Sequence, residues 1–519
     1  MFNLPFFLGL FPLVVLVVLI INVKMPVYKA VLITLALVLG ITYFAFDTPA
    51  SALANGVIYG ALKGLWPIAI VIFGAIFAYN LMQKTGAIGI IRDQLSRVTD
   101  DRRLLLLLIA WGFGAFLEAA AGFSTAVAIP LGILMALGFH PIRAAIAALV
   151  ADTAATAFGA VGIPLTVMGD MLHIPTVGFN GVSFMVVSQL AILNILLPFF
   201  IVVIMEGSVK ALKGIFFITL ITGVMTLIPE LVIAAFVGPE LTAFGGSLVS
   251  LATMIVLFKS RKSPTPAEYK IEHKDEANAP QPTRGEVLRA VSIYAMMFLF
   301  ILIASPLFPG VVKTLNTVST TFSFDVGVKT LKATFNWIST PGMLIVFATL
   351  IGGVLFQRAT PKMIASTVVS TLNQLKYSAL AISVIVAMAT VMDFTGLIAV
   401  VAQPLFDASG KYYPFLAPLI GAVGTFVTGS VTNADVLFGN LQTIAANHLS
   451  LDPTWLVAAN AAGATATKML APQSITIAVS SAGLTNADST LMKGTAPWAV
   501  LYLAILVLVV GFMSPFYAV

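Results

Sequence analysis

Cysteine and charge are what this sequence has least of. None of its 519 residues is cysteine, so disulfides, thiolate nucleophiles and cysteine metal sites are excluded. Charged residues make up 9% of the chain, whereas an ordinary soluble protein carries about 25%. With 59% hydrophobic residues, the chain cannot cover a water-exposed surface. It is therefore predicted to be a polytopic membrane protein. Soluble enzymes, nucleic-acid binders and secreted disulfide scaffolds are excluded.

Histidine is also scarce, and the four that occur share no metal-ligand spacing. The chain carries no His-Glu-x-x-His or Gly-x-Ser-x-Gly signature of a hydrolase. We therefore expect no metal, no cofactor and no enzymatic activity. The histidines are His140, His173, His273 and His448.

A membrane-spanning helix needs roughly 17–25 apolar residues. Candidate runs lie near 7–22, 28–46, 65–83, 144–163, 183–204, 214–230, 242–258, 290–306, 341–357, 376–393 and 496–515. Other pieces are shorter or rich in Gly and Thr, and are interpreted as full spans or as halves of re-entrant hairpins and broken helices. These pieces are 104–120, 123–138, 414–428, 434–449 and 455–470.

The basic residues predict the orientation, because Lys and Arg concentrate in cytoplasmic loops. With the N-terminus outside and the spans alternating, 21 of the 27 Lys and Arg residues fall inside and 5 fall outside. Lys468 is left over, near the membrane. Both termini are therefore predicted on the non-cytoplasmic face.

A fixed offset of 310 aligns two regions of the chain as far as Phe116 with Phe426, and two more residues are inserted before Pro453. The aligned positions include Thr85-Gly86 with Thr395-Gly396, Gly114 with Gly424, Pro141 with Pro453 and Thr153 with Thr465. The helix at 65–83 runs toward a basic loop, whereas its partner at 376–393 runs away from one. Corresponding helices therefore point in opposite directions. Such an inverted-topology repeat is typical of secondary transporters and predicts a substrate site near the bilayer midplane.

One polar, Pro-containing stretch of mixed charge, 259–289, is predicted to be a cytoplasmic linker, with room for a short helix. It divides the chain into an N-terminal half, 1–258, with repeat 1 at about 28–200, and a C-terminal half, 290–519, with repeat 2 at about 341–515.

Four segments interrupt the apolar runs with Gly, Ser, Thr, Asn and Pro: 111–130, 150–170, 421–442 and 463–474. A helix broken at membrane depth exposes N–H groups and a positive dipole end, which can hold an anion. Close helix packing is the alternative for any single Gly or Thr. Four clusters in corresponding parts of two repeats favour a binding site.

Charges at membrane depth are informative, because one at the bilayer centre costs at least ~2.5–3.5 kcal/mol. Glu118 is the main candidate for a proton carrier, and Asp152 and Asp435 are further candidates or polar caps of helix breaks. Lys468 can pair with a substrate carboxylate or with one of these acids. The carboxylates near the outer ends are expected to be solvated: Asp170, Glu230, Glu240, Asp393 and Asp407.

Two pairs of motifs resemble those of the L-lactate permease family of bacterial and archaeal transporters. The first is WGFGAFLEAAAGFSTAVAIP with ADTAATAFGAVGIP, and the second is TFVTGSVTNADVLFGNLQTIAANH with ATKMLAPQSITIA. The resemblance implies import of lactate or glycolate by proton symport, in an all-α fold of inverted repeats with hairpins, working as an elevator. Asp152 and Asp435 depart from the family pattern, in which we expect Asn, and could change substrate size or favour sodium.

The expected function is uptake of small 2-hydroxy monocarboxylates (L-lactate, D-lactate, glycolate) across the plasma (inner) membrane, with a proton as coupling ion. The alternatives are a sodium-coupled carboxylate transporter and a cation/proton antiporter. Proton coupling is assigned to Glu118, Asp152 and Asp435. Substrate binding is assigned to Ser124, Thr125, Thr153, Thr428, Gly429, Ser430, Asn433, Gln442, Lys468, Gln473 and Ser474.

Overall fold

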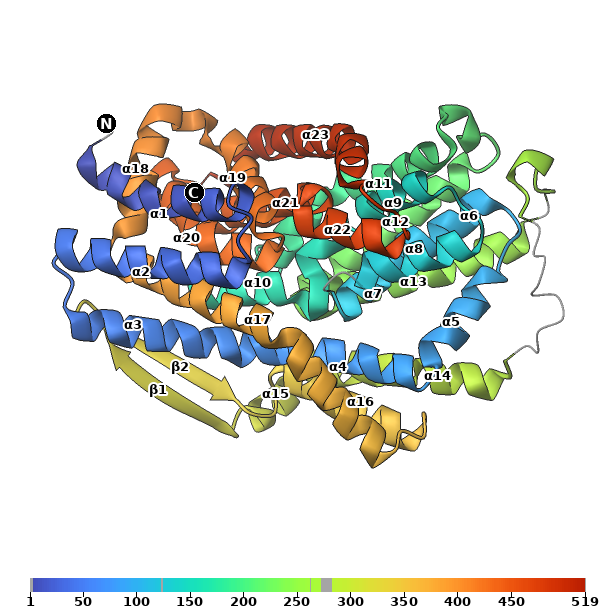
Figure 1. The fold of residues 1–519 in the computed structure, drawn as a ribbon, viewed down its shortest axis with the longest axis horizontal. Coiled ribbons are helices and arrows are strands. Elements are labelled where there is room, and N and C mark those ends of the chain that lie inside the picture. Colours follow the sequence, from blue (N-terminus) through green and yellow to red (C-terminus); the bar gives the residue numbers. More distant parts are fainter. Residues whose placement is uncertain (1–2, 123–124, 262, 272–281, 519) are drawn as a thin grey trace.

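The computed structural model describes residues 3–122, 125–261, 263–271 and 282–518. Within these residues, 11 helical segments are long and apolar enough to cross a membrane. The prediction of a polytopic helical membrane protein is confirmed. In Figure 1, α13 (Pro239–Ser260) ends and α14 (Arg284–Ile303) begins on the right, whereas the β-hairpin of β1 (Ser319–Asp325) and β2 (Thr330–Asn336) lies on the left.

The N-terminal half begins with three helices and a kinked continuation: α1 (Leu4–Ile21), α2 (Val27–Ala45), α3 (Ala50–Lys63), η1 (Gly64–Ala69) and α4 (Ile70–Lys84). The short helix α5 (Ala87–Ser96) follows. The first helix pair consists of one arm made of α6 (Arg102–Leu106), η2 (Leu107–Phe113) and α7 (Gly114–Ala120) and a second arm, α8 (Thr125–Ala136). The first interrupted helix consists of α9 (Pro141–Ala151), η3 (Ala154–Phe158) and α10 (Gly159–Leu172). The last helices before the linker are α11 (Val182–Glu206), η4 (Val209–Leu212), α12 (Phe216–Phe236) and α13 (Pro239–Ser260).

The C-terminal half contains a β-hairpin among its first helices: η5 (Ala267–Tyr269) in the linker, then α14 (Arg284–Ile303), α15 (Pro309–Leu315), β1 (Ser319–Asp325), β2 (Thr330–Asn336), α16 (Pro341–Leu355) and α17 (Pro361–Phe394). The short helix α18 (Leu397–Ser409) and η6 (Gly410–Tyr412) follow. The second helix pair is α19 (Tyr413–Thr428) with α20 (Val431–Leu449), and the second interrupted helix consists of α21 (Pro453–Ala466), η7 (Lys468–Leu470) and α22 (Pro472–Ser481). The chain continues with α23 (Asp488–Met513) and η8 (Ser514–Tyr517).

The structure adds one element to the predicted helical fold: β1 and β2 pair antiparallel, with Ser319 opposite Asn336 and Asp325 opposite Thr330. It also corrects one expectation, because 144–163 is not a continuous span: α9 ends at Ala151 and a turn of 3₁₀ helix precedes α10. The Thr and Phe residues of the β-hairpin favour strands, and its sequence contains no apolar run long enough for a membrane helix.

The two regions aligned by the sequence share one order of elements: a long helix, a short helix, a helix pair, an interrupted helix and a second long helix. Both short helices follow a left-handed glycine, Gly86 and Gly396. Both interrupted helices begin with proline, at Pro141 and Pro453, where the missing N–H costs nothing. Across the regions the packing is reciprocal, with α10 against α20 and α22 against α8, and α11 against α21 and α23 against α9.

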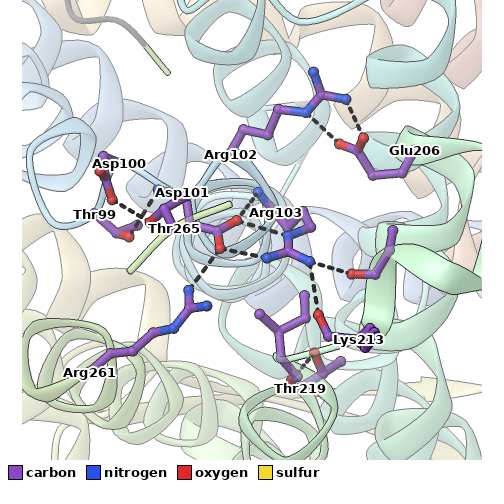
Figure 2. Close-up of polar contacts among 12 residues, drawn as sticks. Thr99, Asp100, Asp101, Arg102, Arg103, Glu206, Lys213, Thr219, Arg261 and Thr265 are labelled. Atoms are coloured by element: carbon purple, nitrogen blue, oxygen red, sulfur yellow. Dashed lines mark hydrogen bonds and ion pairs between the residues drawn. The ribbon is translucent and has the colours of Figure 1, made fainter. Parts of the chain in front are cut away.

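A buried ion cluster anchors the first helix pair at its base (Figure 2). Asp101 caps α6 and binds two guanidinium groups, Arg103 at 2.8 Å and Arg261 at 2.7 Å. Arg103 also donates to the carbonyls of Ala211 and Lys213 and lies 3.7 Å from the ring centroid of Tyr269. The described part of the linker is therefore held against the start of this helix pair.

Candidate functional site

The centre of the candidate site is a buried cluster of two acids and one lysine. Glu118 lies at the end of α7 and Asp152 follows α9, and both side chains are almost wholly buried. Their carboxyl groups are close enough to share a hydrogen bond, and the charge of Lys468 acts on both. The structure thus brings together Glu118, Asp152 and Lys468, which are up to 350 positions apart in sequence.

The cluster forms where the first helix pair meets the break in the interrupted helix beside it. Gly159 begins α10, and any side chain there would collide with the Glu118 carboxyl group. One oxygen of each acid, Glu118 Oε2 and Asp152 Oδ1, is buried without a hydrogen-bond partner in the described part of the chain. Because buried polar atoms are normally paired, these orphan oxygens mark the cluster as a place where a proton or ligand is expected.

Lys468 connects this cluster to the turn between α19 and α20. Its ammonium group donates to the Gly429 carbonyl at 2.8 Å. Gly429 has a φ of +71°, a left-handed conformation that glycine adopts without strain, and a Cβ there would lie 2.6 Å from Gln473 Oε1. The break in the second interrupted helix and the tip of the second helix pair are therefore in direct contact.

The tip itself is held by short-range hydrogen bonds. The Thr428 hydroxyl donates to the Gly424 carbonyl at 2.8 Å and lies 3.1 Å from the Ser430 carbonyl. Ser430 caps α20 by accepting from the Asn433 N–H. The Asn433 side-chain oxygen is buried and has no partner among the described residues, so it is free to receive a donor. Ser474 is buried and Gln473 is exposed in the first turn of α22.

Asp435 belongs to a separate polar network. Its Oδ1 accepts from the Asn460 amide at 2.9 Å, and Asn460 Oδ1 in turn accepts from Gln442 at 3.4 Å. Gln442 then accepts from the Tyr413 hydroxyl at 3.1 Å. Gln442, expected among the substrate ligands, is thus fully occupied within the helix bundle.

The remaining predicted residues lie on the first repeat. Ser124 lies outside the described residues. Thr125 donates to the Gly122 carbonyl at 2.7 Å, and the buried Thr153 hydroxyl donates to the Val150 carbonyl at 2.7 Å. Both hydroxyl protons are committed to the backbone, which leaves only their oxygen lone pairs for a substrate.

The surroundings of two buried polar residues were not predicted from the sequence. Asn460 lies in an alanine-rich helix with no polar neighbour in sequence, so nothing marked it as the partner of Asp435. Glu230 was expected at a solvated end, which is wrong: it is 6% exposed and accepts from the Asn194 amide at 2.8 Å. The apolar run was expected to end at 230, whereas α12 continues to Phe236.

Three large cavities have linings that do not include Glu118, Asp152 or Lys468. Two share Tyr59, Lys63, His173 and Lys332 and have volumes of about 560 and 600 Å³. The third, about 440 Å³, is an apolar groove between α1 and the pair α19–α20. The first of these cavities reaches Asp435, as described below.

The chain matches known proteins over almost its entire length. A family model described as L-lactate permease matches residues 5–517. The L-lactate permease of Streptococcus iniae is 39% identical over 77% of this chain and 82% of its own, and that of Bacillus subtilis is 34% identical over 95% and 92%.

Further similarities extend to a second named substrate and to a solved structure. The glycolate permease GlcA of Escherichia coli is 32% identical over 96% of this chain and 93% of its own. A crystal structure of the Alcanivorax borkumensis YdaH transporter, described as having an unusual topology, covers 90% of this chain and 88% of its own at 12% identity and a TM-score of 0.47.

Proposed function

The chain belongs to the L-lactate permease family, and on that premise we propose that it imports small 2-hydroxy monocarboxylates across the plasma membrane by proton symport. Relatives named as lactate and glycolate permeases support this substrate class. The observation that carries the mechanism is the cluster of Glu118, Asp152 and Lys468 at the meeting point of two interrupted helices.

The charges of the cluster suggest how a proton takes part. Two adjacent buried carboxylates with a single ammonium group leave one negative charge uncompensated, which is costly at membrane depth. One proton shared between Glu118 and Asp152 removes that charge and satisfies their hydrogen bond. We assign Glu118 as the proton carrier and Asp152 as its partner.

The substrate carboxylate is assigned to Lys468 and the tip of the second helix pair. Lys468 donates to the Gly429 carbonyl, and a substrate carboxylate is a stronger acceptor than a carbonyl. Substrate binding would therefore release the tip carbonyl and loosen the turn. The oxygen of Asn433 and the hydroxyl groups of Ser430 and Ser474 are the groups assigned to the 2-hydroxyl.

We further propose that the two repeats have inverted topology and that one bundle moves against the other, as in elevator transporters. The shared order of elements and the reciprocal packing of α10 on α20 and α22 on α8 support this. The 21-to-5 distribution of Lys and Arg supports cytoplasmic placement of the linker and non-cytoplasmic termini.

Labelled-lactate uptake into proteoliposomes tests the proposal. We expect a proton gradient directed into the liposomes, with the outside acidic, to drive uptake. A sodium gradient should leave uptake unchanged, and Glu118→Gln should abolish the response to the pH gradient. Glu230→Gln is the matched control, since that carboxyl is also buried but lies outside the cluster. Uptake driven by sodium alone, or a full proton response in Glu118→Gln, would contradict the assignment.

A further inference from the structure

The cavity of about 560 Å³, which we call the outer cavity, lies between the β-hairpin and the second helix pair. Its lining includes Lys63 of α3, Lys329 and Lys332 of the β-hairpin, Asp393 of α17, and Asp435 and Asn440 of α20. Under the proposed orientation it opens to the non-cytoplasmic side. Asp435 is five residues after Ser430, so at 1.5 Å per residue the cavity comes within about 7.5 Å, along α20, of the tip.

Asp435 gives this cavity an unsatisfied acceptor. The side chain is 1% exposed, and only Oδ1 is paired, with the Asn460 amide. Oδ2 is buried and has no partner within the described residues. A carboxylate oxygen in this state requires a donor, and the cavity is the open volume that Asp435 lines.

The cations around the cavity are compensated, with one exception. Lys63 pairs with Asp170, and Lys329 donates to Asp393 at 3.0 Å, where Asn440 also donates at 2.6 Å. Lys332 lines the outer cavity and the adjacent one, and its ammonium group contacts no carboxylate in the part of the chain that the structure describes. The two ionic pairs cancel, which leaves Lys332 and Asp435 as the uncompensated groups of opposite sign.

We propose that the outer cavity is a second, entry site for the transported 2-hydroxy monocarboxylate, with Lys332 holding the carboxylate and Asp435 accepting a hydrogen bond from the 2-hydroxyl group. The ligand class follows from the two free groups. An ammonium group selects an anion, and an unpaired carboxylate selects a hydrogen-bond donor. A 2-hydroxy acid carries both on adjacent carbons, whereas a simple monocarboxylate carries only the first.

This inference rests on the proposed function and adds a step to it. The substrate would be captured in the outer cavity and then pass the first turn of α20 to reach Lys468. A positively charged side chain at the cavity, such as Lys332, raises the local concentration of the anionic substrate, so it affects substrate association more than the later steps of transport. Lys332 should therefore affect uptake chiefly at low substrate concentration.

The first experiment compares initial uptake rates of lactate in proteoliposomes containing the full chain. Lys332→Gln is expected to raise KM about fivefold with Vmax nearly unchanged, and the difference should shrink as ionic strength rises. Lys411→Gln is the control, because Lys411 is an exposed lysine of η6 that does not line the cavity. Equal KM values in Lys332→Gln, Lys411→Gln and the unaltered chain would overturn the entry site.

The second experiment tests the acceptor. Uptake of lactate is compared with that of propionate, which lacks the hydroxyl group. Asp435→Asn keeps the shape of the side chain but loses one acceptor oxygen, so the preference for lactate over propionate should fall about tenfold, mainly through the lactate rate. An unchanged preference with lactate transport intact would overturn the role of Asp435.

The two proposals fail in different ways. If the unaltered chain transports no 2-hydroxy acid, the proposed function is wrong and the entry site falls with it. If it transports lactate in response to a pH gradient while Lys332→Gln and Asp435→Asn behave as the unaltered chain, only the entry site is wrong.

Discussion

Removal of the Asp101 side chain should strongly destabilise the protein, because it breaks the buried ion cluster at the start of the first helix pair. Asp101 is 0% exposed, and the side chains of Arg103 and Arg261 that bind it are 1% and 11% exposed. Deleting one partner of a buried ion pair costs about 3–5 kcal/mol, because the other charge stays buried and unpaired. Arg103 keeps its bonds to the Ala211 and Lys213 carbonyls, so Asp101→Ala is expected near 3 kcal/mol.

Denaturant unfolding of the detergent-solubilised protein measures this loss, with Asp93→Ala as the control. Asp93 pairs with Arg92, but both side chains are exposed, at 43% and 52%. An exposed pair contributes about 0–1 kcal/mol, so the control should stay close to the unaltered chain. If Asp101→Ala and Asp93→Ala lower the stability equally, the cluster of Figure 2 does not hold the linker as described.

The same carboxyl group predicts the direction of a pH effect. Burial alone would raise the pKa of Asp101, but the hydrogen bonds and charge of Arg103 and Arg261 outweigh it and the pKa is lowered. A carboxyl with a lowered folded-state pKa stabilises the fold above its unfolded pKa of about 3.9, and this contribution is lost as pH falls through the folded value. Below about pH 4 the unaltered chain should therefore lose part of its advantage over Asp101→Ala.

Two further changes test the site and the fold. Gly159→Ala places a methyl group against the Glu118 carboxyl group, so it should abolish proton-driven lactate uptake at normal expression. Gly89 has open space around it, so the control Gly89→Ala should keep full uptake. Full uptake by Gly159→Ala would contradict the close approach of Gly159 to Glu118. Thr283→Ala removes the capping box with Glu286 at the start of α14 and should lower the free energy of unfolding by about 1 kcal/mol. A loss of less than a few tenths of a kcal/mol would show that this cap does not stabilise the protein.

The sequence alone was sufficient for the membrane class, the family and most of the residues at the cluster. Composition and apolar runs predicted the helical membrane fold, and the charge at depth singled out Glu118, Asp152 and Lys468. These predictions rest on local properties of the chain. The β-hairpin was missed because its strands mix polar and apolar residues and β1 is exposed almost throughout, so the hairpin contains no apolar run long enough to indicate a membrane helix.

Long-range pairing could not be predicted from spacing. Gln442 and Asp435 stand in one motif with Asn433, which suggested one common site. On α20, however, Asp435 and Gln442 are seven residues apart and share one face of the helix, whereas Asn433 lies about 200° away from Asp435. Asn460 of α21 forms hydrogen bonds to both Asp435 and Gln442. A motif fixes positions along a helix, but the partner across the interface decides which side chains act together.

The reciprocal packing explains why neither repeat forms the site alone. The alignment identifies equivalent positions, such as Pro141 and Pro453, and the opening long helices of the two repeats do pack on each other, α17 against α3 and α4. At the site, however, the elements in contact are not equivalent ones. Instead α10 packs on α20 and α22 on α8, so each helix pair meets the interrupted helix of the other repeat. Lys468 of the second repeat consequently supplies the positive charge for two acids of the first. Under the proposed function, this charge balance across the two repeats would tie their relative position to the occupancy of the cluster by protons and substrate.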